Sequence, residues 1–226
     1  MKISLVVLTY NEIVGVRHLI DSIPFSAVEE VFFVDGGSTD GTLEFLAERN
    51  ITVYKQDLKG RGEAFHLAFK KAAGDALIFF SPDGNEDPRD IPKFRGYLEQ
   101  GYEMVIGTRM AKGAHNEEDE QFFKWRKWAN NAFNLMANLT WNRGAYVTDT
   151  INGFRAITKD GWAKLGLDAK RYTIEYQSTI RAFKRKLKIF EFPTFENVRL
   201  DGREGAPAIK TGMDFLHLYW KELFIK

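Results

Sequence analysis

An apolar run that stops abruptly at polar residues constrains the fold of this chain most. Ala76–Phe80 has the length and composition of a buried strand, and the sequence SPDGN follows it directly. Asp83 and Asn85 therefore stand where a strand leaves a sheet. Ligands of open α/β sheets bind at that edge, where a carboxylate and an amide can hold a divalent cation with its phosphates. A plain strand-to-helix loop, with Asp90 capping a helix that begins near Pro92, explains the same residues.

The same pattern, an apolar run followed by polar residues and then a helical period, recurs along the chain. Strands are predicted at 3–8, 31–34, 51–54, 76–80 and 104–107. Helical periods follow most of these runs. This alternation indicates an α/β fold, with a Rossmann-like, mostly parallel central sheet and helices on both faces. We expect a single domain over the whole chain of 226 residues.

The composition narrows the classes of function. Lys and Arg (32) nearly balance Asp and Glu (31), so no basic field favours nucleic acid. The chain has no Cys, which removes disulfides, thiolate metal sites and Cys nucleophiles and fits a reducing compartment. The first apolar run is too short for a signal sequence, and no run of about 18 apolar residues predicts a membrane span. We therefore expect a cytoplasmic protein that binds no nucleic acid.

Two glycine-rich loops have features of phosphate or nucleoside sites. VDGGSTDGT places Asp35 at a strand end, where its carboxylate can accept hydrogen bonds from a base or ribose. The alternative is an ordinary loop in which Ser38 or Thr39 caps the next helix. In KGRG, Lys59 and Arg61 flank glycines before a predicted helix, which suits diphosphate oxygens. This motif is not a P-loop, because no GK[ST] follows it.

Several motifs, taken in order, resemble one family of enzymes. They are LTYNE near the N-terminus, VDGGSTDGT, KGRG, the acidic loop after FF, GTR at 107–109 and DTINGFRAI at 149–157. In order and spacing this set resembles the family 2 inverting glycosyltransferases with the GT-A fold, over about residues 1–160. Within that family the chain is most similar to the branch of dolichol-phosphate or polyprenyl-phosphate mannosyl- and glucosyltransferases, which implies a role in cell-envelope glycan synthesis.

The resemblance implies a nucleotide-sugar site with a metal ion. Asp83 matches the second acidic residue of the family's DxD motif and Asn85 an additional amide ligand, so both are expected to bind Mg²⁺ or Mn²⁺. Ser81 replaces the first Asp of DxD, and Gly36 replaces the second Asp of VDDGS, so weaker metal affinity is predicted. The expected nucleotide-sugar contacts are Thr9, Tyr10, Asn11, Glu12, Asp35, Gly37, Ser38, Lys59, Gly60, Asp83 and Gly84.

An aromatic, basic segment at 122–141 has helical spacing. It is predicted to form an amphipathic helix that packs on the sheet. In the branch that the chain resembles, an Arg and a polar residue four positions later bind the acceptor phosphate. By that resemblance Arg126 and Asn130, together with Arg109, are expected to bind it here. The acidic residues at 117–120 are predicted to form a mobile loop.

Asp149 and Arg155 of the DTINGFRAI motif are the expected catalytic residues. With a hydroxyl acceptor, Asp149 would act as general base, because an alcohol must lose a proton as it attacks. A phosphate monoester is already ionised near neutral pH, and Asp149 would then orient Arg155 or the sugar. A third interpretation has Asp149 capping a turn.

The last part of the chain is less informative. It predicts a helix at 172–186, a strand at the sheet margin at 189–195 and a basic loop from 199 to 208. The resemblance makes Arg199, Arg203 and Lys210 candidates for a segment that closes over the donor. The amphipathic end of the chain is predicted to be either a docked terminal helix or an interfacial membrane anchor.

Together these patterns give one expected function and two alternatives. Residues 1–110 would bind the nucleotide diphosphate sugar and residues 111–226 the acceptor. A hexose would move with inversion from GDP-mannose or a UDP-sugar to a polyprenyl or dolichyl phosphate, at the cytoplasmic face of the membrane and with a possible membrane-protein partner. One alternative is a saccharide hydroxyl as acceptor. The other is a nucleotide-binding module without turnover, suggested by the carboxylates missing at Ser81 and Gly36.

Overall fold

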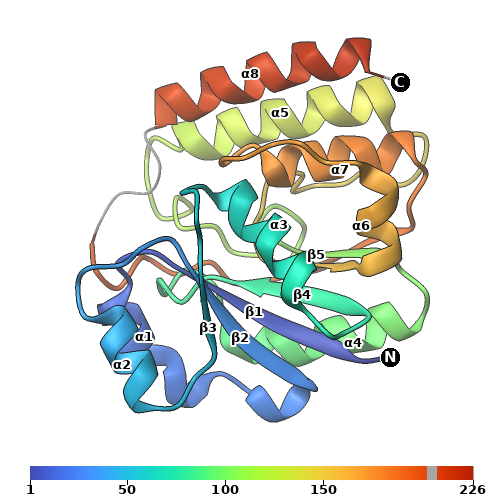
Figure 1. Ribbon diagram of the computed structural model, residues 1–226. Coiled ribbons are helices and arrows are strands. Elements are labelled where there is room, and N and C mark those ends of the chain that lie inside the picture. The colour runs from blue at the N-terminus through green and yellow to red at the C-terminus, as the bar shows by residue number, and fades with distance from the viewer. Residues whose placement is uncertain (203–207, 226) are drawn as a thin grey trace.

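A seven-stranded mixed sheet forms the centre of the molecule (Figure 1). The computed structural model describes residues 1–202 and 208–225. The strand order is β3-β2-β1-β4-β6-β5-β7; β6 runs antiparallel to β4 and β5, and the other pairs are parallel. The strands are β1 (Ile3–Thr9), β2 (Glu30–Asp35), β3 (Val53–Lys55), β4 (Ala76–Phe80), β5 (Met104–Thr108), β6 (Arg155–Thr158) and β7 (Ile189–Pro193).

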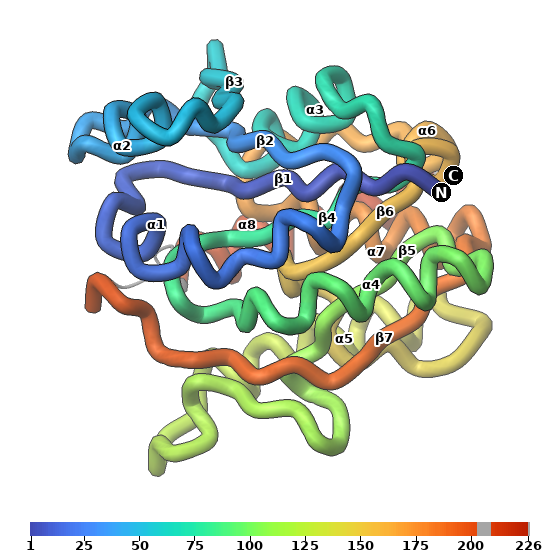
Figure 2. Tube along the Cα trace, turned by 90° about the horizontal axis from the view of Figure 1, so that it is seen from below, coloured from blue at the N-terminus to red at the C-terminus, as the bar shows by residue number. Residues whose placement is uncertain are grey.

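Helices cover both faces of the sheet, as the sequence predicts (Figures 1 and 2). α1, α2 and α4 pack on one face and α3, α6 and α7 on the other, while α5 and α8 form an outer layer over α7. The helices are α1 (Ile13–Leu19), α2 (Thr42–Glu48), α3 (Arg61–Lys71), α4 (Ile91–Glu99), α5 (Trp125–Trp141), α6 (Lys159–Leu165), α7 (Ile174–Lys184) and α8 (Ala208–Phe224). Short 3₁₀ turns lie at Ile20–Ser22, Phe25–Ala27 and Pro88–Asp90.

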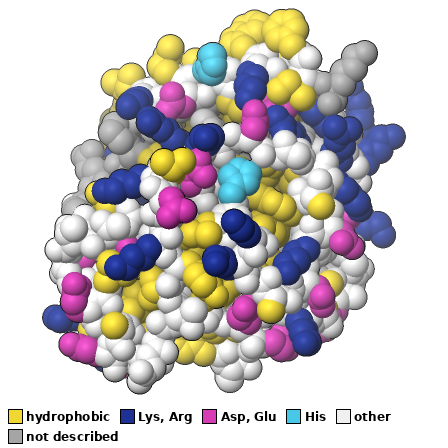
Figure 3. All heavy atoms as spheres, in the orientation of Figure 1, with side chains coloured by type: hydrophobic (Ala, Val, Ile, Leu, Met, Phe, Trp, Pro, Cys, Tyr) yellow, Lys and Arg dark blue, Asp and Glu magenta, His cyan; other side chains and the backbone are white. Residues whose placement is uncertain are grey.

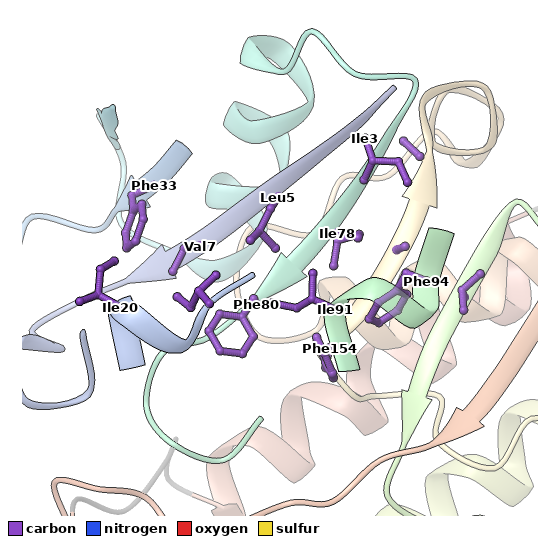
Figure 4. Close-up of a cluster of buried hydrophobic side chains, with 14 of the residues drawn as sticks. Ile3, Leu5, Val7, Ile20, Phe33, Ile78, Phe80, Ile91, Phe94 and Phe154 are labelled. Atoms are coloured by element: carbon purple, nitrogen blue, oxygen red, sulfur yellow. The ribbon is translucent and has the colours of Figure 1, made fainter. Parts of the chain in front are cut away.

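The central strands are buried on both faces, which explains why they read as continuous apolar runs. Leu5 and Val7 of β1 point into the cluster under α1, α2 and α4, part of which is drawn in Figure 4. Val6 and Leu8 point the other way, into the cluster that contains Phe65 of α3. Consecutive strand residues alternate between faces, so a strand covered on both sides needs apolar residues at every position.

Two elements were not predicted from the sequence. β6 begins at Arg155, inside the DTINGFRAI motif, and α6 follows it. β6 is only four residues long and opens with a buried arginine, so no apolar run marks it. β6 comes from the second half of the chain and inserts between β4 and β5 of the first half. The expected nucleotide-binding and acceptor-binding halves therefore share one sheet. The other predicted strands and helices are present, although α5 begins three residues later than predicted.

The helix starts differ from the capping interpretations. Asp90 makes no side-chain capping bond to the main-chain amides of α4. Its carboxylate accepts the hydroxyl of Thr194 at 2.6 Å and pairs with the Lys93 ammonium at 2.6 Å. Before α2 the organising residue is Asp40, whose carboxylate accepts both the amide and the hydroxyl of Thr42. Ser38 does not cap α2; its hydroxyl bonds within the preceding loop.

α8 is a docked helix, as one of the two predictions has it. The ring of Phe215 lies 5.3 Å from that of Phe133 on α5 and 5.4 Å from that of Tyr176 on α7. The outer side of α8 is exposed, with Ile209 at 83% and Trp220 at 61% exposure. Within residues 1–202 and 208–225, no helix is long and apolar enough to cross a membrane.

Candidate active site

A cleft of about 570 Å³ lies at the carboxyl ends of β4 and β5. Its walls come from the loop after β4, the residue after β5, the acidic loop before α5 and the start of that helix, and residues 151–153. Arg61 and residues of 172–175, 194–202 and 211–215 complete them. Segments far apart in the sequence thus meet at one edge of the sheet. The predicted site residues and candidates that line the cleft are Arg61, Asp83, Asn85, Arg109, Arg126, Asn130 and Arg199.

Asp83 is nearly buried in this cleft, with 6% of its surface exposed. Its Oδ1 accepts the main-chain amide of Asn85 at 3.0 Å, and its Oδ2 pairs with Nη2 of Arg199 at 2.8 Å. Burial raises the pKa of Asp83, and the charge of Arg199 opposes that effect. A cationic side chain therefore already stands against the predicted metal ligand.

The segment after β7 covers the loop after β4. The main-chain amide of Leu200 donates to the carbonyl of Asp83 at 3.0 Å, and that of Asn197 donates to the carbonyl of Asn85 at 2.9 Å. A Cβ at Gly84 would come within 2.6 Å of Leu200, and Gly84 has a φ of +97°. Gly84, an expected nucleotide contact, is thus required by this packing. The candidate Arg203 lies outside the described residues.

Glu86 is a cleft residue that the sequence analysis missed. Its Oε2 accepts the main-chain amide of Ser81 at 2.7 Å. Burial, helped by the charge of Asp83, raises the pKa of Glu86 to about 8. The sequence shows an acidic residue in a turn-rich loop, but it does not show that the loop folds back and directs this side chain into the cleft.

Arg109 is held between two carboxylates. Its Nε and Nη2 donate to Asp149 at 2.8 and 3.1 Å, and its Nη1 donates to Oε1 of Glu196 at 2.8 Å. Burial acts to lower the pKa of Arg109, but the charges of Asp149 and Glu196 outweigh it and raise that pKa. The guanidinium is therefore charged and fixed in orientation at the cleft wall.

The two expected catalytic residues are not among the residues that line the cleft. Asp149 is fully buried and both of its carboxylate oxygens bond to Arg109, so it positions that arginine and neither caps a turn nor stands free as a base. Arg155 is also fully buried, and it donates to main-chain oxygens and to the hydroxyls of Ser178 and Thr179 on α7. Burial lowers the pKa of Arg155 to about 10. This placement contradicts a substrate contact for Arg155, because its donors already bond inside the protein.

The start of α5 places its polar residues at the cleft. Arg126 and Asn130 lie one turn apart and both line it. The acidic loop before α5 is tied down, contrary to the expectation of a mobile loop. Glu118 is 4% exposed and accepts the main-chain amide of Lys127 at 2.8 Å, while the Lys127 ammonium pairs with Asp119. Glu118 thereby satisfies an unpaired amide in the first turn of α5.

The loops after β1 and β2 contain most of the expected nucleotide contacts, and Asp35 organises them. Oδ1 of Asp35 accepts the amides of Gly37 and Ser38, each at 2.8 Å. Oδ2 accepts the hydroxyls of Thr9 at 2.8 Å and Ser38 at 2.6 Å. Asn11, at a φ of +56°, donates its main-chain amide to the Ser38 hydroxyl at 2.8 Å. The Asp35 carboxylate is fully buried, and its hydrogen bonds shape the loop.

Tyr10 and Lys59 form an exposed pair beside these loops. The Lys59 ammonium lies 4.8 Å from the centre of the Tyr10 ring, which is half exposed. A Cβ at Gly36 would come within 3.2 Å of the Tyr10 ring and of Oε1 of Gln56. Glycine at this position therefore leaves room for the ring. The main-chain amide of Glu12 bonds to the first residue of α2, which fixes the end of the loop.

The KGRG motif divides between two places. Lys59 stays beside the nucleotide loops, whereas Arg61 pairs with Glu175 of α7 and lines the cleft. A Cβ at Gly60 would come within 2.2 Å of the carbonyl oxygen of Lys170. Gly60, an expected nucleotide contact, is thus needed for close packing against another segment.

The site can now be compared with known proteins. Residues 4–162 match the family model described as Glycosyl transferase family 2, which is more than half of the chain. The chain belongs to glycosyl transferase family 2. The resemblance seen in the motifs is therefore confirmed, and the protein is a glycosyltransferase.

Three curated relatives of this glycosyltransferase have informative names. Glycosyltransferase AglJ of Haloferax volcanii is 28% identical over 93% of the chain, and UDP-N-acetylglucosamine–dolichyl-phosphate N-acetylglucosaminyltransferase of Methanococcus voltae is 27% identical over 84%. Dolichol-phosphate mannosyltransferase of Pyrococcus furiosus is 25% identical over 97% of the chain. The chain spans 69%, 84% and 63% of the lengths of these relatives, respectively.

A solved structure with the same fold is glucosyl-3-phosphoglycerate synthase from Mycobacterium tuberculosis, in complex with Mn²⁺, UDP-glucose and phosphoglyceric acid. Its TM-score is 0.75 at 22% identity, covering 97% of this chain and 79% of that one. At this identity the likeness shows the fold alone. It confirms the predicted GT-A architecture of the glycosyltransferase.

The cleft of the glycosyltransferase offers few protein ligands for a metal ion. In the part of the chain that the structure describes, no three His, Cys, Asp or Glu side chains form a group that could hold one. A cation carried by substrate phosphates needs only one or two protein carboxylates. Asp83 presents one, at a place where burial disfavours its charge and Arg199 balances it. The residues present fit an ion that arrives with the nucleotide.

Proposed function

We propose that this glycosyltransferase moves a hexose, with inversion, from a nucleotide diphosphate sugar to a polyprenyl phosphate. The observation that carries the proposal is the mixed chemistry of the acceptor side of the cleft. Arg109, Arg126 and Asn130 line it together with the aromatic rings of Trp125 and Phe133. Guanidinium groups suit a phosphate, and the adjacent rings suit the first isoprene units of its lipid chain.

The aromatic wall of the cleft continues onto the outer surface. Phe122, Phe123 and Trp128, beside the start of α5, are exposed by 101%, 62% and 54%. Hydrophobic side chains also gather over α8 and α5, at the upper edge of Figure 3. A surface of this kind suits contact with the bilayer in which a polyprenyl phosphate resides. We include in the proposal a peripheral contact with the cytoplasmic face of the membrane.

The chemistry assigned to each residue follows from its position. Asp83 and Asn85 would hold a Mg²⁺ or Mn²⁺ ion on the donor diphosphate, and the chemistry supplied there would be neutralisation of the leaving group's charge. Tyr10, Lys59 and the loops shaped by Asp35 bind the nucleoside end. On the other side of the cleft, the two arginines bind and orient the acceptor phosphate. Catalysis then rests chiefly on positioning.

The state of Asp149 favours a phosphate acceptor over a saccharide hydroxyl. A hydroxyl needs a base, and Asp149, the expected base, has both oxygens bonded to Arg109. An ionised phosphate oxygen needs none. Two of the relatives named above carry dolichyl phosphate or dolichol phosphate in their names, which supports the same acceptor class. The sugars in those two names differ, so they do not identify the donor. An assay must distinguish GDP-mannose from the UDP-sugars.

The test is a transfer assay with Mg²⁺ or Mn²⁺ and a short-chain polyprenyl phosphate. GDP-mannose, UDP-glucose and UDP-N-acetylglucosamine are offered separately. We expect a lipid-linked sugar with one donor and no product with Asp83→Ala. Arg126→Ala should lower kcat/KM for the acceptor about 10- to 100-fold, the loss of one charged hydrogen-bonding group, and leave donor hydrolysis unchanged. Arg143→Ala, an exposed arginine just beyond the other end of α5, is the matched control.

Two other results of this assay would favour the alternative functions. Nucleotide release without lipid product would point to a saccharide acceptor. Nucleotide binding without turnover of any donor would identify a binding module. Either result contradicts the proposed function.

A further inference from the structure

The loop after β4 turns back on itself and returns a carboxylate to the end of the strand. Gly84, with its φ of +97°, lets the chain reverse between Ser81 and Glu86. Oε2 of Glu86 then lies 2.7 Å from the main-chain nitrogen of Ser81. A residue five positions along the chain thus places its carboxyl group beside the main chain of position 81.

This placement matters because Ser81 brings no charge of its own. An aspartate side chain has a single methylene, so its carboxylate stays close to its own main chain. Glu86 puts a carboxylate into that same neighbourhood from a different point of the chain. Ser81, Asp83, Asn85 and Glu86 all line the cleft. Glu86 therefore brings a carboxyl group to the neighbourhood of position 81, where the resemblance expects an acidic residue.

Glu86 also keeps an oxygen for a ligand. Its Oε2 bonds to the Ser81 amide, and among the hydrogen bonds and ion pairs of residues 1–202 and 208–225 none engages Oε1. The side chain is half-buried, so it reaches the cleft without being sealed from it. Arg199, the cation that balances Asp83, makes no such pair with Glu86 within the described residues.

We propose that Glu86 acts with Asp83 as the second carboxylate that holds the divalent cation of a bound nucleotide diphosphate sugar. Hard cations prefer carboxylate oxygens, and those that arrive on phosphates take one or two of them from the protein. The proposal rests on the proposed function, because it needs a donor that carries a cation. It reverses the expectation that Ser81 leaves the metal site with one carboxylate.

Three variants separate a metal ligand from a residue that only shapes the loop. Glu86→Gln removes the charge and keeps an oxygen that can accept the Ser81 amide. Ser81→Asp in the Glu86→Gln background returns a carboxylate to the strand end. Glu99→Gln, an exposed residue of α4 outside the cleft lining, is the matched control.

The measurement is Mn²⁺ binding by water-proton relaxation, in the presence of UDP and, separately, of GDP. Glu86→Gln should weaken Mn²⁺ binding about 10- to 100-fold, and the double variant should return to within about threefold of wild type. Glu99→Gln should equal wild type. Thermal unfolding of each variant checks that the fold is intact.

Wild-type Mn²⁺ affinity in Glu86→Gln would overturn this inference and leave the proposed function standing. A loss in Glu86→Gln that the double variant does not recover would assign Glu86 to the shape of the loop, and would overturn the inference as well. Failure of the wild-type protein to bind Mn²⁺ with either nucleotide would overturn both this inference and the metal-dependent donor site.

Discussion

The buried charges of Asp35 and Arg109 are stabilised in different ways. Asp35 takes three of its four side-chain hydrogen bonds from Gly37 and Ser38, two and three residues away, and the fourth from the hydroxyl of Thr9, 26 residues away. Arg109 is neutralised by Asp149 and Glu196, which lie 40 and 87 residues away along the chain. Most hydrogen bonds of the Asp35 carboxylate are therefore local, whereas the partners of Arg109 come only from distant segments.

The sharpest test of this contrast is Arg109→Met. It leaves the buried carboxylates of Asp149 and Glu196 without a counter-charge, so the free energy of unfolding should fall by about 3–5 kcal/mol. Urea denaturation measures it. Arg89→Met, which removes an exposed arginine paired with Asp87 two residues away, should cause no measurable loss. If the free energy of unfolding fell equally little in both variants, distant partners would not stabilise the protein more than local ones, and the contrast would be wrong.

Asp35→Asn should cost less. The asparagine keeps an oxygen for the amides of Gly37 and Ser38. It loses the charge, and an NH₂ group replaces the oxygen that accepts the hydroxyls of Thr9 and Ser38. We expect the free energy of unfolding to fall by about 1–2 kcal/mol, measured in the same urea titration. A loss larger than that of Arg109→Met would show that the loop is not self-sufficient.

The third test measures how the free energy of unfolding of Glu86→Gln depends on pH. Glu86 lies in the loop after β4, between the nucleotide loops and the acceptor side of the cleft. The pKa of Glu86 rises from 4.5 to about 8 on folding, so the folded protein binds its proton more tightly than the unfolded chain. In EDTA, the free energy of unfolding should therefore decline as the pH rises from about 4.5 through 8. Because the side chain is partly solvated, we expect Glu86→Gln to remove only about 1 kcal/mol of that decline. If the free energy of unfolding declined equally with pH in wild type and Glu86→Gln, the raised pKa of Glu86 would be contradicted.

The smallest effect on stability is expected on the outer face of α8. Trp220→Glu should change the free energy of unfolding by less than about 0.5 kcal/mol, because the side chain is largely in solvent. Sedimentation with anionic vesicles should nevertheless show several-fold weaker binding. Leu58→Glu, at an exposed site with the same 61% exposure, is the control and should bind vesicles as wild type does. Vesicle binding that is unchanged in Trp220→Glu would argue against the membrane contact.

The parts of the fold that could be predicted are those in which neighbouring residues carry the signal. β1, β2 and β4 are apolar at most positions because both of their faces are covered, and their polar ends mark one edge of the sheet. Arg109, Arg126 and Asn130 were placed at the cleft by resemblance, and the structure brings them there. Asp83 and Asn85 also line it.

The errors share a cause, because each depends on side-chain direction or on partners distant in sequence. Arg155 looks like a catalytic residue in a motif, yet the neighbouring α7 takes up its guanidinium. Asp149 looks like a free base until Arg109 arrives from β5. Glu86 was overlooked because a loop sequence does not reveal that its last side chain points back at its first residue. A single sequence does not reveal the partners of Arg155 and Asp149 or the direction of the Glu86 side chain.

The position of β6 has a consequence for how the protein is made. β4 and β5 leave the ribosome well before residues 155–158, yet neither can pair with the other, because β6 lies between them. Until that late segment emerges, β4 offers an open hydrogen-bonding edge along five buried apolar residues. The nascent chain therefore passes through a period in which this edge is vulnerable to self-association. Once β6 pairs with β4, that edge is covered, and the nascent chain should no longer need a chaperone to prevent its aggregation there.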